Sequence, residues 1–457
     1  MMIIRRSLVS PLLALAVMTT APVAQAQEST PAPGTELMEL YTWLHQNPEL
    51  SFKEKTSSAV LAAELEDLGF SVTTGVGDDW VRNKSMEDEG TVRDGVGGYG
   101  VVGVYENGEG PTVLIRTDTD ALPVPEETGL DYASKVTGMT WTGVESPVMH
   151  ACGHDVHMTN WVGTARKLIE NKDDWSGTLV MIAQPAEELG LGAKAMIEDG
   201  LYSDFPLPDY NLALHVSASA PAGTVAYSSG YALANVDSVD IHVKGVGGHG
   251  AYPHTTKDPV VVGSSIVMAL QTLVARNVDP QKPAVVTVGS FKAGAKHNII
   301  SNEAELLLTV RSYDDNTRQL LLDGIKRIAK GQAESYGAPE PEIRIDSDYT
   351  PSTYNDPAMT NEAVTAIKGA IGEENVTEVT PVMGGEDFSQ FGRTQEDVPG
   401  LIFWLGAVDP ETYAQSEAGE VELPSLHSSG FAPDADLALE TGVNAMTAAA
   451  MALFNKS

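Results

Sequence analysis

The sequence predicts an α/β protein with a central, mostly parallel sheet and a smaller α+β unit inserted into it. Four short apolar runs of the kind that form buried strands are separated by stretches with helical spacing, which is typical of parallel sheets. From about residue 230 the pattern changes to strand, helix, strand, strand, helix, strand, which indicates a separate α+β unit. The 457 residues also exceed what one hydrophobic core usually accommodates, so we expect two domains.

Residues 1–26 have the features of a secretory signal peptide. Arg5 and Arg6 precede an apolar run at 8–17, and Ala24-Gln25-Ala26 forms a small-x-small cleavage site. We therefore expect an exported protein, either periplasmic or extracellular. The run is too short for a membrane span, and no later stretch reaches the roughly 18 to 20 apolar residues that a span requires.

The amino-acid composition limits the kinds of molecule that the protein is expected to bind. The chain has 63 acidic and 28 basic side chains, a formal charge of -35, and a single cysteine, Cys152. Such acidity disfavours binding to nucleic acid or to an anionic membrane, and we interpret it as a feature of solubility. Export brings no internal disulfide, because Cys152 has no partner in the chain.

Two helices are predicted after the signal peptide and a Pro-rich linker, at 36–46 and 55–68. Leucines and a tyrosine recur at helical spacing in the first, and Pro48 and Gly69 end the two helices. Residues 78–95 carry many charges without periodicity, so we predict a surface loop or insertion there. A second acidic loop is expected at 414–422.

Polar residues follow the predicted strands of the larger sheet. Because open α/β sheets bind ligands at the carboxyl ends of their strands, these residues are expected to converge. The strands are 112–116, followed by Asp118 and Asp120; 178–183, followed by Glu187 and Glu188; 211–214, followed by His215; and 401–405, which precedes the segment with His427.

The domain boundaries follow from the same patterns. Residues 27–229 and 350–457 are predicted to form the larger domain, and 230–349 the inserted one. The larger domain resumes with a helix at 361–371 and ends with a helix from about 436. Within the insertion we expect strands at 236–243, 284–288 and 304–310, and helices at 259–274 and 314–335.

Two stretches contain side chains that are suited to metal binding or catalysis. Residues 150–157 contain three histidines, Cys152 and an aspartate, side chains that include the preferred ligands of borderline-soft divalent ions. Of the adjacent pair Glu187 and Glu188, one could bind a metal while the other acts as a general base. The alternative is an acid-rich helix N-terminus, which is common.

Four motifs in this order resemble the hippurate hydrolase and indole-3-acetyl-amino-acid hydrolase family of di-metal aminoacylases and carboxypeptidases. They are His-Ala-Cys-Gly-His-Asp-x-His at 150–157, Gln-Pro-Ala-Glu-Glu at 184–188, Gly-Gly-His-Gly-Ala-x-Pro-His at 247–254 and Leu-His-Ser-Ser-x-Phe at 426–431. The similarity covers nearly all of the chain after residue 26. It implies a di-metal aminopeptidase-like catalytic domain with an inserted lid and dimerisation domain.

The resemblance also implies an activity and a ligand set. The protein would hydrolyse the amide bond of N-acyl amino acids or related small N-acyl amides, with Glu187 as general base. A metallo-dipeptidase or carboxypeptidase of the same group is the alternative. Two divalent ions, Zn or Mn with Co or Ni as further options, would be held by Cys152, His154, Glu188, His215 and His427.

Other residues receive roles by the same resemblance. His249 would stabilise the oxyanion in the partner subunit's site, which implies a homodimer; the alternative is a turn histidine. Asn298, Arg311 and Glu386 would contact substrate, although Asn298 could instead cap a turn and Arg311 could be merely solvated. Asp118, Asp120 and His157 would support the ligands from behind.

Two further hypotheses belong to other classes. Cys152 could be a nucleophile activated by His154 without a metal, but two residues so close in sequence rarely reach that geometry, and Glu187 and Glu188 would go unexplained. A non-catalytic binding protein could retain the fold, but every expected ligand and the base are present.

Overall fold

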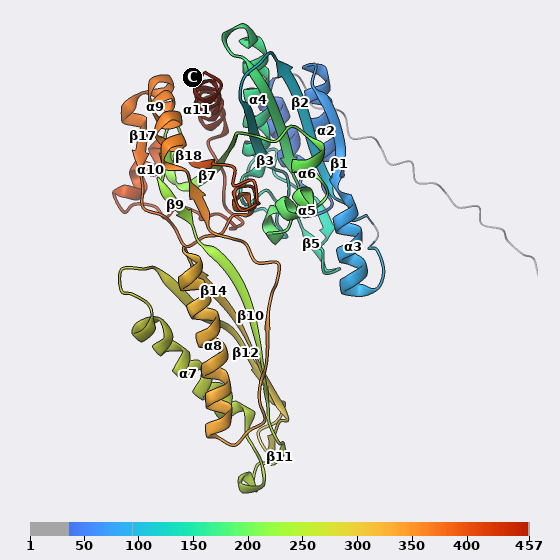
Figure 1. Ribbon diagram of the computed structural model, residues 1–457, viewed down its shortest axis with the longest axis vertical. Helices are drawn as coiled ribbons and strands as arrows, with labels where there is room; N and C mark the ends of the chain where they lie inside the picture. Colours follow the sequence, from blue (N-terminus) through green and yellow to red (C-terminus); the bar gives the residue numbers. More distant parts are fainter. Residues whose placement is uncertain (1–35, 94, 456–457) are drawn as a thin grey trace, which may run out of the picture. The chain divides into compact units, whose positions relative to one another are not determined.

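The computed structural model describes residues 36–93 and 95–455, so the predicted signal peptide lies outside the described residues. The four predicted apolar strands lie side by side and parallel in the centre of a ten-stranded sheet (Figure 1). In sheet order they are β6 (Gly177–Gln184), β3 (Thr112–Asp118), β7 (Tyr210–Pro221) and β18 (Gly400–Val408). The predicted α/β fold with a central, mostly parallel sheet is confirmed.

The central strands are buried on both faces. In β3, Val113 and Ile115 belong to the hydrophobic core on one face of the sheet, and Leu114 between them belongs to the core on the other. Double burial explains why these strands read as continuous apolar runs rather than as alternating ones. The helices that supply buried residues to the first core are α1 (Leu37–Gln46), α2 (Lys55–Asp67), α4 (His154–Glu170), α9 (Pro357–Ile371) and α11 (Ala435–Phe454); those of the second are α5 (Gly192–Glu198) and α6 (Leu201–Asp204).

Shorter or antiparallel strands complete the large sheet. They are β1 (Ser71–Gly77) and β2 (Tyr99–Asn107) at one side, and β16 (Thr353–Asn355), β9 (Gly230–Leu233), β8 (Val225–Tyr227) and β17 (Val376–Glu378) at the other. Because β9 pairs with β16, the chain leaves the large sheet near Ala234 rather than at residue 230. A separate hairpin joins β4 (Thr137–Met139) and β5 (Glu145–Pro147).

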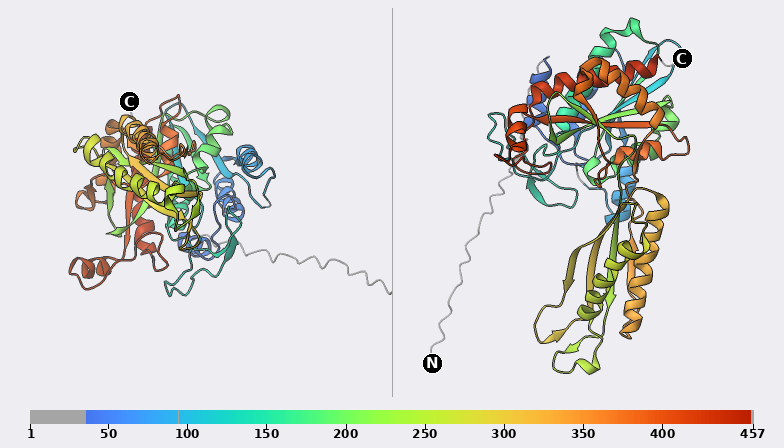
Figure 2. Two further views of the ribbon diagram at one scale, coloured as in Figure 1. Left: turned by 90° about the horizontal axis from the view of Figure 1, so that it is seen from below. Right: turned by 90° about the vertical axis from the view of Figure 1, so that its left-hand side faces the viewer.

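The inserted segment forms a second sheet with its own hydrophobic core (Figure 2). Its elements follow the predicted order of strand, helix, strand, strand, helix, strand, with a small two-stranded pair at the tip. The sheet contains β10 (Asn235–Lys244), β12 (Ala284–Ala293), β14 (Glu303–Ser312) and β15 (Glu342–Ile345); the helices are α7 (Pro259–Asn277) and α8 (Asp315–Ser335), and the tip pair is β11 (Gly248–His249) and β13 (Ile299–Ile300).

Two predicted loops, at 78–95 and 414–422, are wrong in part, because a helix occupies 78–89 of the first and 414–417 of the second. Residues Asp78–Glu89 form helix α3, whose Trp80 and Val81 pack with Phe52. Pro410–Glu417 form helix α10, which has no buried residue and is capped by Asp409, whose side chain accepts from Thr412 N. Helices with so narrow a buried face, or none, leave little apolar periodicity to detect, because their formation depends on local capping and charge placement.

The remaining short 3₁₀ helices lie mostly at the ends of the longer elements. They are η1 (Lys172–Asp174), η2 (Glu187–Leu189), η3 (Pro253–Thr255), η4 (Glu373–Asn375) and η5 (Asp387–Gly392). Within the described residues, α7 and α11 are long and apolar enough to cross a membrane by length and composition alone. Both carry core residues of a sheet domain, α7 in the inserted unit and α11 in the larger one.

Candidate active site

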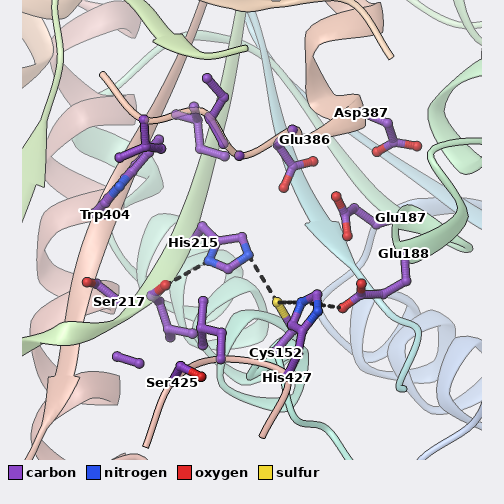
Figure 3. A pocket seen from close by; sticks show the side chains of 18 of the residues that line it. Cys152, Glu187, Glu188, His215, Ser217, Glu386, Asp387, Trp404, Ser425 and His427 are labelled. Carbon is purple, nitrogen blue, oxygen red and sulfur yellow. Dashed lines mark hydrogen bonds and ion pairs between the residues drawn. The ribbon is translucent and has the colours of Figure 1, made fainter. Parts of the chain in front are cut away.

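The five residues proposed as metal ligands converge at the carboxyl ends of the parallel strands. They line, or lie directly behind, a pocket of about 790 Å³. Figure 3 shows four of them, Cys152, Glu188, His215 and His427. Cys152 and His154 stand at the start of α4, and Glu188 stands in η2 just after β6. His215 belongs to β7, and His427 lies in the loop before α11.

The distances between these side chains suit ligands of common ions. Cys152 Sγ lies 3.4 Å from His215 Nε2 and 3.3 Å from His427 Nε2. Glu188 Oε1 lies 3.5 Å from His427 Nε2 and 3.9 Å from His154 Nε2. Two ligands at zinc-binding distances in a tetrahedral arrangement are about 3.5 Å apart. Two groups of three, Cys152 with His154 and His215, and Cys152 with Glu188 and His427, share the thiol, so two neighbouring ions could share it.

Backbone carbonyls orient two of the histidines. His154 Nδ1 lies 2.7 Å from the carbonyl oxygen of Asp120, and His215 Nδ1 lies 2.7 Å from that of Val216. A carbonyl only accepts, so both Nδ1 atoms carry a proton, and Nε2 of each ring is the nitrogen left to bind a metal ion. His154 Nε2 and Glu188 Oε1 are buried without a hydrogen-bond partner among the described residues. Two buried acceptors facing each other fit a cation between them.

The local backbone brings the ligands together. Gly153, between Cys152 and His154, has φ +77°, and a Cβ there would lie 2.6 Å from Val216. Only glycine fits this turn without strain. His427 has φ +65°, uncommon for a residue with a Cβ, and its N–H donates to the carbonyl of Ala151 at 2.9 Å. Such strain is typical of functional sites.

The electrostatics of the cluster also favour a cation. Burial raises the pKa of Glu188 to about 8, and burial together with nearby carboxylates raises the pKa of Glu187 and of the Cys152 thiol. Burial alone would lower the pKa of His154, but Asp118 and Asp120 outweigh it and raise the pKa to about 10. Among the proposed ligands, Cys152, His154 and Glu188 therefore retain protons that a divalent ion would displace.

Arg116, which sequence reasoning assigned no role, organises the acidic wall of the site. It lies on β3, fully buried, and donates from Nη1 to Asp118 at 2.8 Å and from Nη2 to Glu386 at 2.8 Å and Asp387 at 3.2 Å. Its Nε donates to Gln184. The charged residue inside the apolar run 112–116 was the available signal, since buried charges are nearly always paired.

Asp118, Asp120 and His157, which are expected to support the metal ligands, make contacts that fit this role. Asp118 accepts from Nδ1 of His157 at 2.7 Å, and Nε2 of His157 accepts from Val216 N at 2.8 Å. Both ring nitrogens of His157 are therefore occupied. The carboxylate of Asp120 accepts the N–H groups of Glu187 and Glu188, each at 3.0 Å, and so fixes the segment that carries both acids.

The expected substrate contacts divide into two groups. Arg311 and Glu386 line the pocket, Arg311 with Nη1 donating to the carbonyl of Met383 at 3.0 Å. His249 and Asn298 instead lie exposed at the tip of the inserted unit, where Gly250 N donates to the carbonyl of Asn298. Neither of these two residues is among those that line the pocket.

His45 is buried between two carboxylates. Its Nδ1 lies 2.6 Å from Asp155, the residue after His154, and its Nε2 lies 3.0 Å from Glu126. Burial would lower the pKa of His45, but these two hydrogen bonds raise it to about 10. The imidazolium thus fastens α1 to the first turn of α4 from behind the ligands.

Comparison with known proteins agrees with this geometry. The sequence pattern of peptidase family M20/M25/M40 matches residues 114–428. Thermostable carboxypeptidase 2 of Saccharolobus solfataricus is 37% identical over 415 residues, 90% of this chain and 94% of that protein. N-acetylcysteine deacetylase of Bacillus subtilis is 32% identical over 409 residues, 89% of this chain and 98% of that protein.

A solved structure extends the likeness to three dimensions. The Bacillus subtilis YXEP protein, described as a dinuclear metal binding peptidase from the M20 family, has a TM-score of 0.70 and 27% identity. The match covers 92% of this chain and 98% of that one. This chain therefore belongs to peptidase family M20/M25/M40, and it is a metal-dependent hydrolase of amide or peptide bonds.

Proposed function

We propose that this protein is an exported di-metal amidohydrolase that cleaves the amide bond of N-acyl amino acids or related small N-acyl amides. The observation that carries the proposal is the convergence of five ligand side chains from four segments around a shared thiol, with Glu187 beside them. The resemblance to hippurate and indole-3-acetyl-amino-acid hydrolases supports the choice of substrate. Export rests on residues 1–26 alone.

The residues can perform the hydrolysis in two steps. Two divalent ions held by Cys152, His154, Glu188, His215 and His427 would supply Lewis acidity toward the amide carbonyl and make water more acidic. Glu187, whose Oε2 lies 3.9 Å from His154 Nε2, takes a proton from the attacking water and passes it to the departing nitrogen. Burial and neighbouring carboxylates raise the pKa of Glu187, which favours this return of the proton.

The pocket suits an amide with one anionic and one apolar part. Arg311 is the side chain placed to pair with a substrate carboxylate, in a pocket otherwise rich in acids. Apolar walls are available for an acyl group from Leu233, Val382, Ile402, Trp404 and Leu426. A carboxypeptidase that accepts a peptide in the same place is the second candidate, favoured by the 37% identity to the Saccharolobus solfataricus carboxypeptidase.

Removal of metal is expected to abolish the activity. Exhaustive EDTA treatment should lower hydrolysis of N-acyl amino acids by roughly 100-fold or more, and Mn or Zn should restore it, because the chemistry needs a Lewis acid. The assay should include matched dipeptides, and faster turnover of these would favour the carboxypeptidase. Activity that survives complete chelation would overturn the metal mechanism and favour the Cys152 nucleophile.

We also propose a homodimer in which His249 enters the partner subunit's site. The exposed tip position of His249, away from its own chain's pocket, supports this role. Light scattering should give twice the monomer mass, and His249→Ala should lower kcat about tenfold or more. His254→Ala, in the same loop, is the control and should leave kcat unchanged. An active monomer, or an unimpaired His249→Ala variant, would contradict the proposal.

A further inference from the structure

The segment that carries Glu187 is held only in part by its own local structure, through hydrogen bonds from Gly190 N to the carbonyl of Glu187 and from Gly192 N to that of Ala186. Strand β6 ends at Gln184, and η2 is a single turn from Glu187 to Leu189. Between them Ala186 has φ +50°, a left-handed conformation that is unfavourable for a residue with a Cβ. Such a conformation persists only where surrounding contacts require it. The direction of the Glu187 side chain therefore depends on contacts from other parts of the chain.

Three consecutive N–H groups of this segment donate to buried carboxyl groups. Glu187 N and Glu188 N donate to the two carboxylate oxygens of Asp120, each at 3.0 Å. Ala186 N donates to Oε1 of Glu54 at 2.8 Å, across 132 residues of sequence. The sequence predicts a supporting role for Asp120 but assigns no role to Glu54. The hydrogen bond from Ala186 to Glu54 is formed at the left-handed residue itself.

Glu54 precedes helix α2, but its carboxyl group does not serve to cap that helix. Glu54 stands at the N-cap of α2, but its side chain makes no capping hydrogen bond. Glu49 performs that role by accepting from Thr56 N and Ser57 N. Glu54 is fully buried, and its Oε2 has no hydrogen-bond partner among the described residues. A buried carboxyl group is costly, so a contact that uses it needs a reason.

We propose that Glu54 is a positioning residue that sets the orientation of Glu187 by accepting the N–H of Ala186. The inference rests on the proposed role of Glu187 as general base. Burial and the charge of Asp120 raise the pKa of Glu54, which favours a neutral acceptor over an anion facing the metal site. A neutral acceptor fixes the loop without adding another negative charge beside Glu187.

Two substitutions at Glu54 test the proposal. Glu54→Met removes the acceptor at similar volume and should lower kcat roughly 10- to 100-fold, because small misplacements of catalytic groups have effects of this size. KM should stay within about twofold and metal content should be unchanged, since no ligand or substrate contact is removed. Glu54→Gln retains a carbonyl acceptor and should keep kcat within about threefold, with an unchanged pH profile.

The matched control is Glu49→Ala, which weakens the cap of the same helix without touching Ala186. It should lower thermal stability and leave kcat unchanged. A Glu54→Met variant with normal kcat, a Glu54→Gln variant as impaired as Glu54→Met, or an equal loss of kcat in Glu49→Ala would overturn the positioning role. If Glu54→Met does not fold, Glu54→Gln decides, since a clear loss of kcat there contradicts a role as neutral acceptor.

The failure of this inference can be told apart from failure of the proposed function. Full activity in Glu187→Gln would remove the base on which both depend. Loss of activity in Glu187→Gln combined with normal kcat in Glu54→Met would overturn the role of Glu54 alone.

Discussion

Glu187→Gln is expected to lower kcat about 10³-fold while leaving metal content and KM close to those of the unmodified enzyme. The substitution keeps the size of the side chain and both backbone contacts of the segment to Asp120, but it removes the group that takes the proton from water. Steady-state kinetics on an N-acyl amino acid, with metal analysis of the same preparation, gives the measurement.

Glu188→Gln is the matched control for that experiment. Its Oε1 lies among the histidine nitrogens of the cluster, so this variant should lose metal affinity together with activity. Added metal should then rescue Glu188→Gln in part and Glu187→Gln not at all. Full turnover by Glu187→Gln, or the reverse pattern of rescue, would contradict the assignment of the base.

Arg116→Met is expected to destabilise the protein by about 3–5 kcal/mol, because it leaves buried carboxylates without their cation. The guanidinium contacts Asp118, Glu386 and Asp387, all of them buried. Urea unfolding of metal-free protein, compared between variant and parent, measures the loss. The loss should be largest at high pH and should shrink as pH falls, because acid protonates the unpaired carboxyl groups.

Arg82→Met gives the control for Arg116. Arg82 pairs with Asp78 on the exposed face of α3, where ion pairs add little to stability. Its removal should leave the urea midpoint unchanged within error. An Arg116→Met variant that is as stable as the parent at both high and low pH would show that the three carboxyl groups are protonated or paired elsewhere.

The fold could be predicted wherever burial imposes a pattern on the residues. The four central strands could be predicted because both of their faces are covered, which gives continuous apolar runs. The inserted unit could be predicted because β10 alternates between buried and partly exposed positions. Helix α10 was missed for the converse reason, since none of its residues is buried and only its cap defines it. The start of the inserted unit was predicted at residue 230 instead of near Ala234. The reason is that β9, a strand of four residues, carries no pattern that reveals its partner β16.

The site could be predicted as a set of residues but not as a network. Cys152, His154, Glu188, His215 and His427 were named from motifs, and the structure brings them together. Arg116 and Glu54 were not named, because their partners lie far away in the sequence: Glu386 is 270 residues from Arg116, and Ala186 is 132 residues from Glu54. No local spacing can record a contact of that kind.

The sequence by itself therefore determined the class of sheet, the presence of an inserted unit and the chemical identity of the candidate metal-binding side chains. These properties depend on residue type and on periodicity along one segment, both of which can be read from the chain. Only the tertiary structure decided which ring nitrogen of His154 and His215 faces the cluster, how its acids are paired, and that His249 is not among the residues that line the pocket. Those properties depend on contacts between segments that meet only when the chain has folded.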